Sequence, residues 1–488
     1  MRLVVFAIIG TLFSFKSVAS PWVGTLDPHL HHDLVTVSEY GLIDSVVNTY
    51  PVPWKGISSQ LNRIDTESLP SHVALAVVRL RHYLVAQQRS AWDSYSELYA
   101  ASDKARFTGF DAEQRPSARF TQTVEYTQGR WSAQVSMNAE PGGEYNLDQS
   151  YLAVQLADWT FAVSALDQWW GPGQAASLIL TDNARPVPVL SLSRGTTQQS
   201  ESVWLRWLGP WYFTAQLGEL QDERQVDGVK LWRTRFTFKP LNGLELGASW
   251  AAMWGGEGQT NGLSGFLDVI TFQKECANGA ASCDPELNTT VGNHIAGFDA
   301  KYTFRVLDTP VSVYAQRVGE DAVDGYKVTD NANLFGISTY LGSTYVYAET
   351  SDTNIACAGD GSTVTNCYYE SGLYPGGYRH HQRAIGSTFD SDAKYTTIGA
   401  RFSVRKLDNV QVSLSRIELN PDGQRPSPVL GDSIQEDLWY FSGAYQTAFS
   451  DWQVKVGLNI AYREFELQAR DNETDVNGYL HIRYAFPD

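Results

Sequence analysis

The chain has 488 residues, with 37 Lys and Arg against 54 Asp and Glu, a formal net charge of −17. A chain this acidic has no diffuse positive field for a phosphate backbone, so nucleic acid is excluded as an expected partner. Its 25 Tyr, 21 Phe and 15 Trp supply more buriable aromatic surface than a disordered chain holds.

Residues 1–19 have the pattern of a secretory signal peptide. Met1-Arg2 is a short positive start, Leu3 to Phe15 is an apolar stretch too short to span a bilayer, and Ser17-Val18-Ala19 is a small-x-small cleavage motif. We therefore expect export, with cleavage after Ala19. No later segment reaches the ~20 apolar residues that a membrane helix needs.

Residues 20–103 are predicted to form a small periplasmic helical domain. Apolar residues recur there at helical spacing, as in Leu30, Leu34 and Val37, and again in Val77, Leu80 and Leu84. The nearby His29, His31 and His32 could suggest a metal site, but they have no matching carboxylates. A solvated helix start is the favoured interpretation, and no metal site is predicted.

Residues 104–488 are predicted to form a transmembrane β-barrel. The period changes to two, as in Trp452, Val454, Val456, Leu458, Ile460 and Tyr462, which alternate with polar or small residues. A soluble β-sandwich also alternates. Strands of about ten residues, joined alternately by tight turns and long polar loops, favour an outer-membrane barrel with long external loops.

Loop parity sets the expected number of strands. If the helical domain is periplasmic, the first strand must run outward, and this requires a strand near residues 105–113 before the one at 118–127. The count is then eighteen, with a sixth strand at 202–208 and residues 169–201 as one external connection. Apolar segments at 178–180 and 187–192 could form a further hairpin and give twenty strands. Both counts are even, as a closed bacterial barrel requires.

Four cysteines fit the oxidising compartment beyond the inner membrane. Cys276 and Cys283 lie in one Gly/Asn/Ala-rich stretch, and Cys357 and Cys367 lie in another. Of the three possible pairings, the two local disulfides Cys276–Cys283 and Cys357–Cys367 are the economical one. They would constrain long loops, and their spacing does not resemble a metal site.

The alternation also places several cations inside the barrel, namely Arg233, Arg235, Arg401, Lys455, Arg463 and Arg483. A wide basic lumen suggests conduction of anions or binding of an anionic ligand. The alternative interpretation is that these side chains pair with internal Asp and Glu. A porin or transport channel for anionic solutes is therefore kept as the second functional hypothesis.

Some long connections are rich in aromatic and polar side chains. Flat rings beside hydrogen-bonding groups suit sugars, and Arg suits the carboxylate of a uronic acid. Tyr and Trp at strand ends also form the interfacial girdle of a barrel. The sequence holds no nucleotide-binding, zinc-protease or nucleophile-elbow motif, so neither an enzyme nor a cofactor is predicted.

One stretch resembles a known family. Trp169-Trp170-Gly171-Pro172-Gly173, followed by Asn183-Ala184-Arg185-Pro186-Val187-Pro188 and Leu190-Ser191-Leu192-Ser193-Arg194, is similar to the signature of the Wzi capsule assembly family. Asp33-Leu34 and Tyr40-Gly41-Leu42-Ile43 resemble that family's helical start. The end departs from an ordinary barrel terminus, because Phe486 is followed by Pro487-Asp488.

The resemblance implies an eighteen-stranded outer-membrane barrel that acts as a lectin for capsular polysaccharide or exopolysaccharide. The expected partners are an acidic polysaccharide and outer-membrane lipid, and we expect a monomer. The residues proposed to bind the polysaccharide are Trp169, Trp170, Arg185, Arg194, Tyr368, Tyr369, Arg379 and Arg383.

Overall fold

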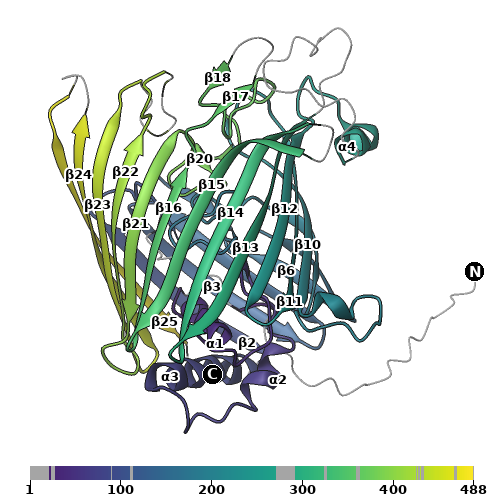
Figure 1. Cartoon of the computed structure of the whole chain (residues 1–488), viewed down its shortest axis with the longest axis vertical. Helices are drawn as coiled ribbons and strands as arrows, with labels where there is room; N and C mark the ends of the chain where they lie inside the picture. Colours follow the sequence, from purple (N-terminus) through teal and green to yellow (C-terminus); the bar gives the residue numbers. More distant parts are fainter. Residues whose placement is uncertain are drawn as a thin grey trace, which may run out of the picture.

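A computed structural model gives the fold of the chain (Figure 1). It describes residues 21–486 except 24–27, 90, 110–113, 271–291, 324–326, 359–362, 425, 427–428, 430–432 and 466–469. The expected signal peptide and the expected Cys276–Cys283 disulfide lie outside the described residues.

Three helices precede the barrel, as the apolar spacing predicts: α1 (Pro28–Glu39), α2 (Ile57–Leu61) and α3 (Ser71–Arg89). Leu34 on α1 and Leu80 on α3 belong to one apolar core that joins these helices. The helices close one end of the barrel, which we call the helix end (Figure 1). None of the described helices is long and apolar enough to cross a membrane.

In the described part of the chain, eighteen antiparallel strands form a closed barrel, which confirms the predicted count. They are β2 (Trp92–Ala101), β3 (Ala118–Gln128), β4 (Trp131–Glu140), β6 (Tyr151–Leu156), β7 (Trp159–Ser164), β9 (Val189–Arg194), β10 (Trp211–Glu219), β11 (Lys230–Leu241), β12 (Leu244–Trp254), β13 (Asn293–Val306), β14 (Thr309–Val323), β15 (Lys327–Leu341), β16 (Thr344–Asp352), β21 (Ala393–Phe402), β22 (Asn409–Leu419), β23 (Glu436–Phe449), β24 (Trp452–Phe465) and β25 (Glu473–Ala485). The first and last strands pair, with Tyr95 opposite Ala485, and so close the barrel.

The remaining elements are short. Strand β5 (Glu144–Asn146) pairs with the end of β4 beyond β6. Among the described residues, three small sheets lie outside the barrel ladder: β1 (Thr49–Tyr50) with β8 (Trp169–Trp170), β17 (Ala356–Ala358) with β18 (Thr363–Thr365), and β19 (Arg379–His380) with β20 (Arg383–Ala384). Helix α4 (Gly262–Ile270) and the 3-10 helix η1 (Arg206–Leu208) lie in connections between strands.

Two strands differ from the predicted positions. The first barrel strand is β2 at Trp92–Ala101 rather than 105–113. Its inward side chains Tyr95 and Tyr99 are buried, whereas its outward positions carry Ser94 and Ser96 between the exposed Trp92 and Leu98, so the apolar outer face is interrupted by polar residues. The sixth strand is β9 at Val189–Arg194, and the expected strand at 202–208 is a connection that contains η1. Residues 187–192 therefore supply the sixth strand and do not add a hairpin.

Short turns join most strands at the helix end, with the long β9–β10 connection as an exception, and long connections join most strands at the opposite end, which we call the loop end (Figure 1). Strand β3 reaches β4 through residues 129–130, and β13 reaches β14 through residues 307–308, both at the helix end. By contrast, 40 residues separate β16 from β21 at the loop end. This asymmetry matches the prediction.

The interior of the barrel is filled by its own connections. One core joins Trp170 and Leu178 with Tyr368 and Tyr378 and with inward residues of the wall such as Leu334. Outward positions of the wall carry exposed apolar side chains, including Val163, Leu190, Phe298, Phe335, Ile398 and Val456. The barrel thus has an apolar outer face and a packed interior.

Candidate functional site

A cavity of about 730 Å³ lies near the loop end, against strands β23, β24 and β25. We call it the loop-end cavity. Its lining comes from residues 103–107 after β2, from residues 381–390, and from the ends of these three strands. Strands β23 and β24 lean away from the barrel at this end (Figure 1). The cavity is therefore built by segments far apart in the sequence.

The lining is richer in cations than the chain as a whole. Five basic side chains contribute, Lys104, Arg106, Arg383, Arg463 and Arg470, against the three carboxylates of Asp103, Asp390 and Asp475. This is the reverse of the chain's excess of 54 acidic over 37 basic residues. A local cationic surface on an acidic protein favours an anionic ligand.

Two of these cations are fixed by one buried carboxylate. Glu436 has no exposed side-chain surface and bonds Arg106 at 2.6 Å and Arg463 at 2.6 Å. Arg463 also contacts Glu473 and Asp475, each at 3.1 Å, and both carboxylates are half exposed. The Glu436 carboxylate therefore holds the two guanidinium groups beside the cavity. Because this carboxylate is buried, water screens its attraction to them only weakly.

Arg383 links the β2–β3 connection to the β7–β9 connection beside the cavity. Its guanidinium donates to the carbonyl oxygens of Ala105 at 2.9 Å and Arg106 at 3.2 Å, and to Asn183 Oδ1 at 2.8 Å. These hydrogen bonds hold the guanidinium of Arg383 in the lining of the cavity. Of the eight residues predicted to bind polysaccharide, Arg383 lines this cavity.

An aromatic ring accompanies the cations. Tyr440 of β23 lines the cavity and packs edge-on against Phe107, with ring centroids 5.6 Å apart. Amide side chains of Asn183, Asn459 and Asn477 also reach the lining. A half-buried tyrosine beside amides and guanidiniums offers an apolar face and hydrogen-bonding groups together, which is the chemistry that a sugar ring requires.

The four predicted aromatic platforms are buried. Trp169 and Trp170 are 2% and 0% exposed, and they pair with Tyr50 and Thr49 in the small sheet β1–β8. Tyr368 and Tyr369 have no exposed surface and both donate hydrogen bonds to the carbonyl of Leu178. In this state their rings hold the connections inside the barrel, and a polymer outside cannot reach them.

Arg379 is also engaged within the protein. Its guanidinium bonds Asp390 at 2.6 Å and Glu370 at 2.7 Å. These carboxylates hold the pKa of Arg379 above its usual value, against the opposing effect of burial. Arg379 therefore organises the connection between β16 and β21.

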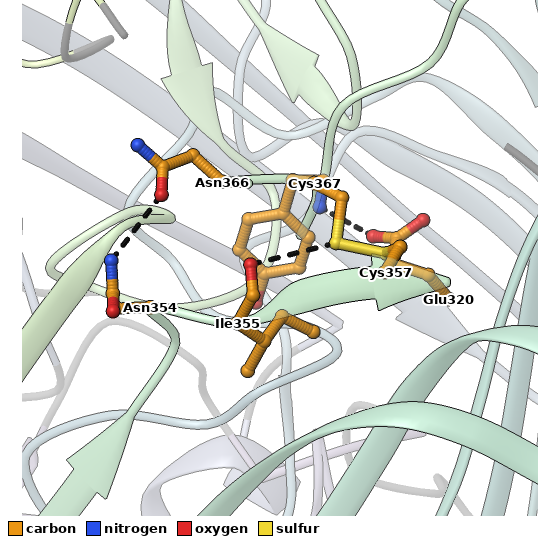
Figure 2. The surroundings of a disulfide bond; sticks show 7 residues. Glu320, Asn354, Ile355, Cys357, Asn366 and Cys367 are labelled. Atoms are coloured by element: carbon orange, nitrogen blue, oxygen red, sulfur yellow. Dashed lines mark hydrogen bonds between the residues drawn. A yellow bond between two sulfur atoms is a disulfide. The ribbon is translucent and has the colours of Figure 1, made fainter. Parts of the chain in front are cut away.

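The same connection contains the confirmed disulfide Cys357–Cys367. Figure 2 shows it beside Asn354 and Asn366, whose amides are 3.3 Å apart and hydrogen-bonded. Asn366 also donates to Asp392 at 2.9 Å. The disulfide and these amides fix the outer part of the connection over the filled barrel.

The last two predicted residues lie apart from each other. Arg185 bonds Asp148 at 2.9 Å near the loop end, and its carbonyl oxygen lies 3.0 Å from His380 Nδ1. Arg194 ends β9 at the helix end, where its guanidinium lies 3.9 Å from the ring centroid of Trp211. The structure thus does not bring the eight residues together.

The prediction missed Lys104, Arg106, Tyr440 and Arg470, which also line the cavity. Arg463 was identified from the sequence only as an inward cation. The available signal was the alternation of β24, which places Arg463 on the inward face near the loop end of that strand. The cavity lies against this part of β24. No local motif marks Lys104 or Arg470.

Some of the cations predicted inside the barrel pair with acidic side chains, as the alternative interpretation holds, and others contact amide or aromatic groups. Arg235 bonds Asp299 at 2.6 Å, and Arg401 donates to Gln174 Oε1 at 2.8 Å. Arg233 lies 5.9 Å from the ring centroid of Trp170. No set of three or more His, Cys, Asp and Glu side chains suited to a metal ion occurs within the described ranges.

A closed barrel of eighteen strands with an apolar outer face, short turns at one end and long loops at the other has the architecture of the outer-membrane class. Comparison with known proteins extends this. The family described as capsule assembly protein Wzi matches residues 87–477, and the chain belongs to this family.

Two relatives are informative. An uncharacterized 55.8 kDa protein in the cps region of Klebsiella pneumoniae is 31% identical over 356 residues, which cover 68% of this chain and 65% of that protein. Escherichia coli Wzi, described as an outer-membrane protein involved in group 1 capsule assembly and a carbohydrate-binding β-barrel, is 24% identical. It aligns with a TM-score of 0.79 over 95% of this chain and 99% of its own. This likeness supports the fold.

Proposed function

We propose that the protein is a non-enzymatic outer-membrane lectin that holds an acidic capsular polysaccharide or exopolysaccharide at the cell surface. The observation that carries this proposal is the loop-end cavity, which is lined by the cations Lys104, Arg383 and Arg470 and by the ring of Tyr440. Guanidinium and ammonium groups suit uronate carboxylates, and the ring suits the apolar face of a sugar. The carbohydrate-binding relative supports the same function.

The cellular arrangement belongs to the same proposal. Residues 1–19 are removed on export, the helical segment before β2 faces the periplasm, and the eighteen strands from β2 to β25 form a monomeric barrel in the outer membrane. The support is the helix end, where short turns and helices lie together as in barrels with short periplasmic turns. The loop-end cavity then faces the outside of the cell.

The anion channel is the weaker alternative. The pairing of Arg235 with Asp299 removes an uncompensated charge from the interior. The connection from β7 to β9 packs against wall residues such as Leu334 across the inside of the barrel. A lectin needs no open lumen, whereas conduction does.

The test compares cell-bound with released polysaccharide in the source bacterium, with total polymer measured in both fractions. One strain carries the wild-type gene and a second carries a deletion of the gene. A third carries the double variant Lys104→Ala with Arg470→Ala, and a fourth carries the single variant Tyr440→Ala. We expect unchanged total polymer with a shift into the medium for the deletion and for the cavity variants. Lys104 and Arg470 are exposed, so the amount of barrel in the membrane should not change in their double variant. Because Tyr440 packs on Phe107 in the core, Tyr440→Ala is compared at an equal measured amount of barrel.

Arg405→Ala with Lys406→Ala is the matched control, because it also removes two exposed cations but at the helix end. It should leave the polymer cell-bound. An unchanged partition in the deletion strain would refute the lectin. A shift in the deletion strain without a shift in the cavity variants would refute this cavity as the site.

A further inference from the structure

The connection between β9 and β10 carries large apolar side chains that point away from the protein. Trp204 is 86% exposed, Val203 is 79% exposed and Trp207 is 66% exposed. The polar neighbours Glu201 and Arg206 are also exposed. We call residues 202–208 the hook. Three large exposed apolar side chains within seven residues present far more apolar surface than a loop in water normally does.

The hook lies at the helix end of the barrel. It follows β9, whose last residue Arg194 pairs with Trp159 beside the turn at Asp158. Asp158 in turn bonds Lys55, which lies between the helices, at 2.7 Å. In Figure 1 the blue-green chain before β10 leaves the wall sideways near the helices. The hook is thus at the level of the short turns.

The hook is continuous with the apolar outer face of the barrel. Trp207 packs edge-on against Phe238, an outward residue of β11, with ring centroids 6.2 Å apart. Beside them on the same side of the wall, Trp211 and Phe236 have centroids 6.0 Å apart. Aromatic residues in this position form the interfacial girdle of membrane barrels.

The barrel strands are short where the hook begins. Strands β7 and β9 have 6 residues each, whereas β14 and β15 have 15 each. Six residues at about 3.3 Å each, tilted by ~40°, give a height of only about 15 Å. The apolar band of such barrels is about 25 Å tall. The wall at β7 and β9 therefore falls short of the band unless another segment extends it.

The hook has its own internal hydrogen bonds, as a segment in lipid requires. Trp207 Nε1 donates to the carbonyl of Trp204 at 2.9 Å, and the backbone N–H of Arg206 donates to the carbonyl of Ser202 at 2.9 Å. Gln199 Nε2 donates to the carbonyl of Arg206 at 2.7 Å. Pairing of backbone groups within the segment lowers the cost of removing it from water.

We propose that the hook is a membrane-binding element that inserts Val203, Trp204 and Trp207 among the phospholipids of the periplasmic leaflet. It extends the apolar surface of the barrel where β7 and β9 are short. The indole rings lie at the boundary of headgroups and acyl chains, where tryptophan is favoured. Glu201 and Arg206 remain at the aqueous surface.

The test places single cysteines in the full chain and attaches a nitroxide label without reductant, which preserves the Cys357–Cys367 disulfide. The positions are Trp204 and Val203 in the hook, Phe161 on the outer face of β7 as the lipid reference, and Lys406 as the aqueous reference. The protein is reconstituted in vesicles of phosphatidylethanolamine and phosphatidylglycerol. Accessibility to oxygen and to a water-soluble nickel chelate is then compared, with the wild-type chain as the labelling background.

We expect labels at Trp204 and Val203 to give an oxygen-to-nickel ratio between those at Lys406 and Phe161, and several-fold above that at Lys406. A ratio like that of Lys406 would overturn the proposal. Strong dipolar coupling between labels at Trp204 would also overturn it, because a second copy of the chain would then cover the hook. If Trp204→Cys fails to fold, Val203→Cys decides the question, since this smaller exposed side chain makes no core contact.

Discussion

The carboxylate of Glu349 on β16 accepts a hydrogen bond from the backbone N–H of Ala176 at 3.0 Å, which fixes the β7–β9 connection inside the barrel. The same carboxylate accepts N–H groups of Gln174 at 2.6 Å and Ala175 at 3.1 Å. The hydroxyl of Tyr395 donates to it at 2.7 Å. One wall side chain thus satisfies several otherwise orphaned donors of a buried connection.

We expect Glu349→Ala to loosen this connection. Loss of the acceptor leaves buried N–H groups unpaired, at a cost of about 3 kcal/mol. Single-channel recording in planar bilayers should then detect openings that are rare or absent in the wild-type protein. Glu349→Gln, which keeps the size and one acceptor, should have a smaller effect. Equal conductance of wild-type and Glu349→Ala proteins would contradict the anchoring role.

The Cys357–Cys367 disulfide should stabilise the outer connection locally. It closes a loop with a sequence separation of 10, for which chain entropy predicts about 3 kcal/mol. We expect Cys357→Ser with Cys367→Ser to keep the barrel folded and to speed hydrogen exchange at residues 354–367. Exchange in the distant strand β3 serves as the control. Unchanged exchange at residues 354–367 would show that the amide network alone holds the connection.

Asp392 should make the same connection sensitive to pH. Burial raises the pKa of its carboxyl to about 7, and the negative charge of Asp422 acts in the same direction, whereas the hydrogen bond from Asn354 opposes them. The folded state therefore binds a proton more tightly than the unfolded state, so local stability falls as pH rises from about 4 to about 7.

The expected loss is at most about 4 kcal/mol. Hydrogen exchange at Thr353 and Asn354, corrected for intrinsic rates, measures it, because the N–H of Asp392 bonds the carbonyl of Thr353. Asp392→Asn should flatten this pH dependence. A variant with the same slope as the wild-type protein would assign the effect to another group.

His380 is expected to remain neutral at physiological pH. Burial lowers its pKa to about 4. Its Nε2 accepts the N–H of Gln221 at 3.3 Å, so Nδ1 carries the proton and donates to the carbonyl of Arg185 at 3.0 Å. Local stability should therefore be full above about pH 6.5 and fall as pH decreases toward 4.

Nitrogen NMR of histidine-labelled protein should find the Nδ1–H tautomer at His380 and no titration above pH 5. The resonance can be assigned with His380→Gln, which removes it. A titration midpoint between pH 6 and 7 would contradict the buried, neutral ring. Such a midpoint would mean that the β19–β20 hairpin is exposed to water in solution.

The barrel was predictable because its signals are local. Alternation along β24 and β25 and the alternation of turn and loop lengths follow from a chain that crosses between two environments. Strand β2 was not predicted because Ser94 and Ser96 interrupt the apolar residues of its outer face, so its alternation is weak. Residues 202–208 were predicted as a strand because they are rich in apolar side chains. Local sequence does not show whether such a segment pairs with neighbouring strands.

The candidate site was predictable only in its chemistry. Aromatic and basic residues in long connections predicted a sugar-binding surface, but local sequence does not tell whether a loop stands outside a barrel or folds into it. Trp170 and Tyr369 fold inward and pack in the core, whereas Tyr440 of β23 reaches the cavity. The cavity lining joins residues from positions 103 to 477, and this proximity arises only after barrel closure.

The sequence by itself determined the helical start, the even-numbered closed barrel, the difference between its two ends and one local disulfide, because periodicity, turn length and short cysteine spacing are properties of neighbouring residues. Tertiary structure decided which connections fill the barrel, which cations line the loop-end cavity and where the strands of the wall are short. Those features depend on hydrogen bonds such as that between Glu349 and Ala176, whose partners are 173 residues apart.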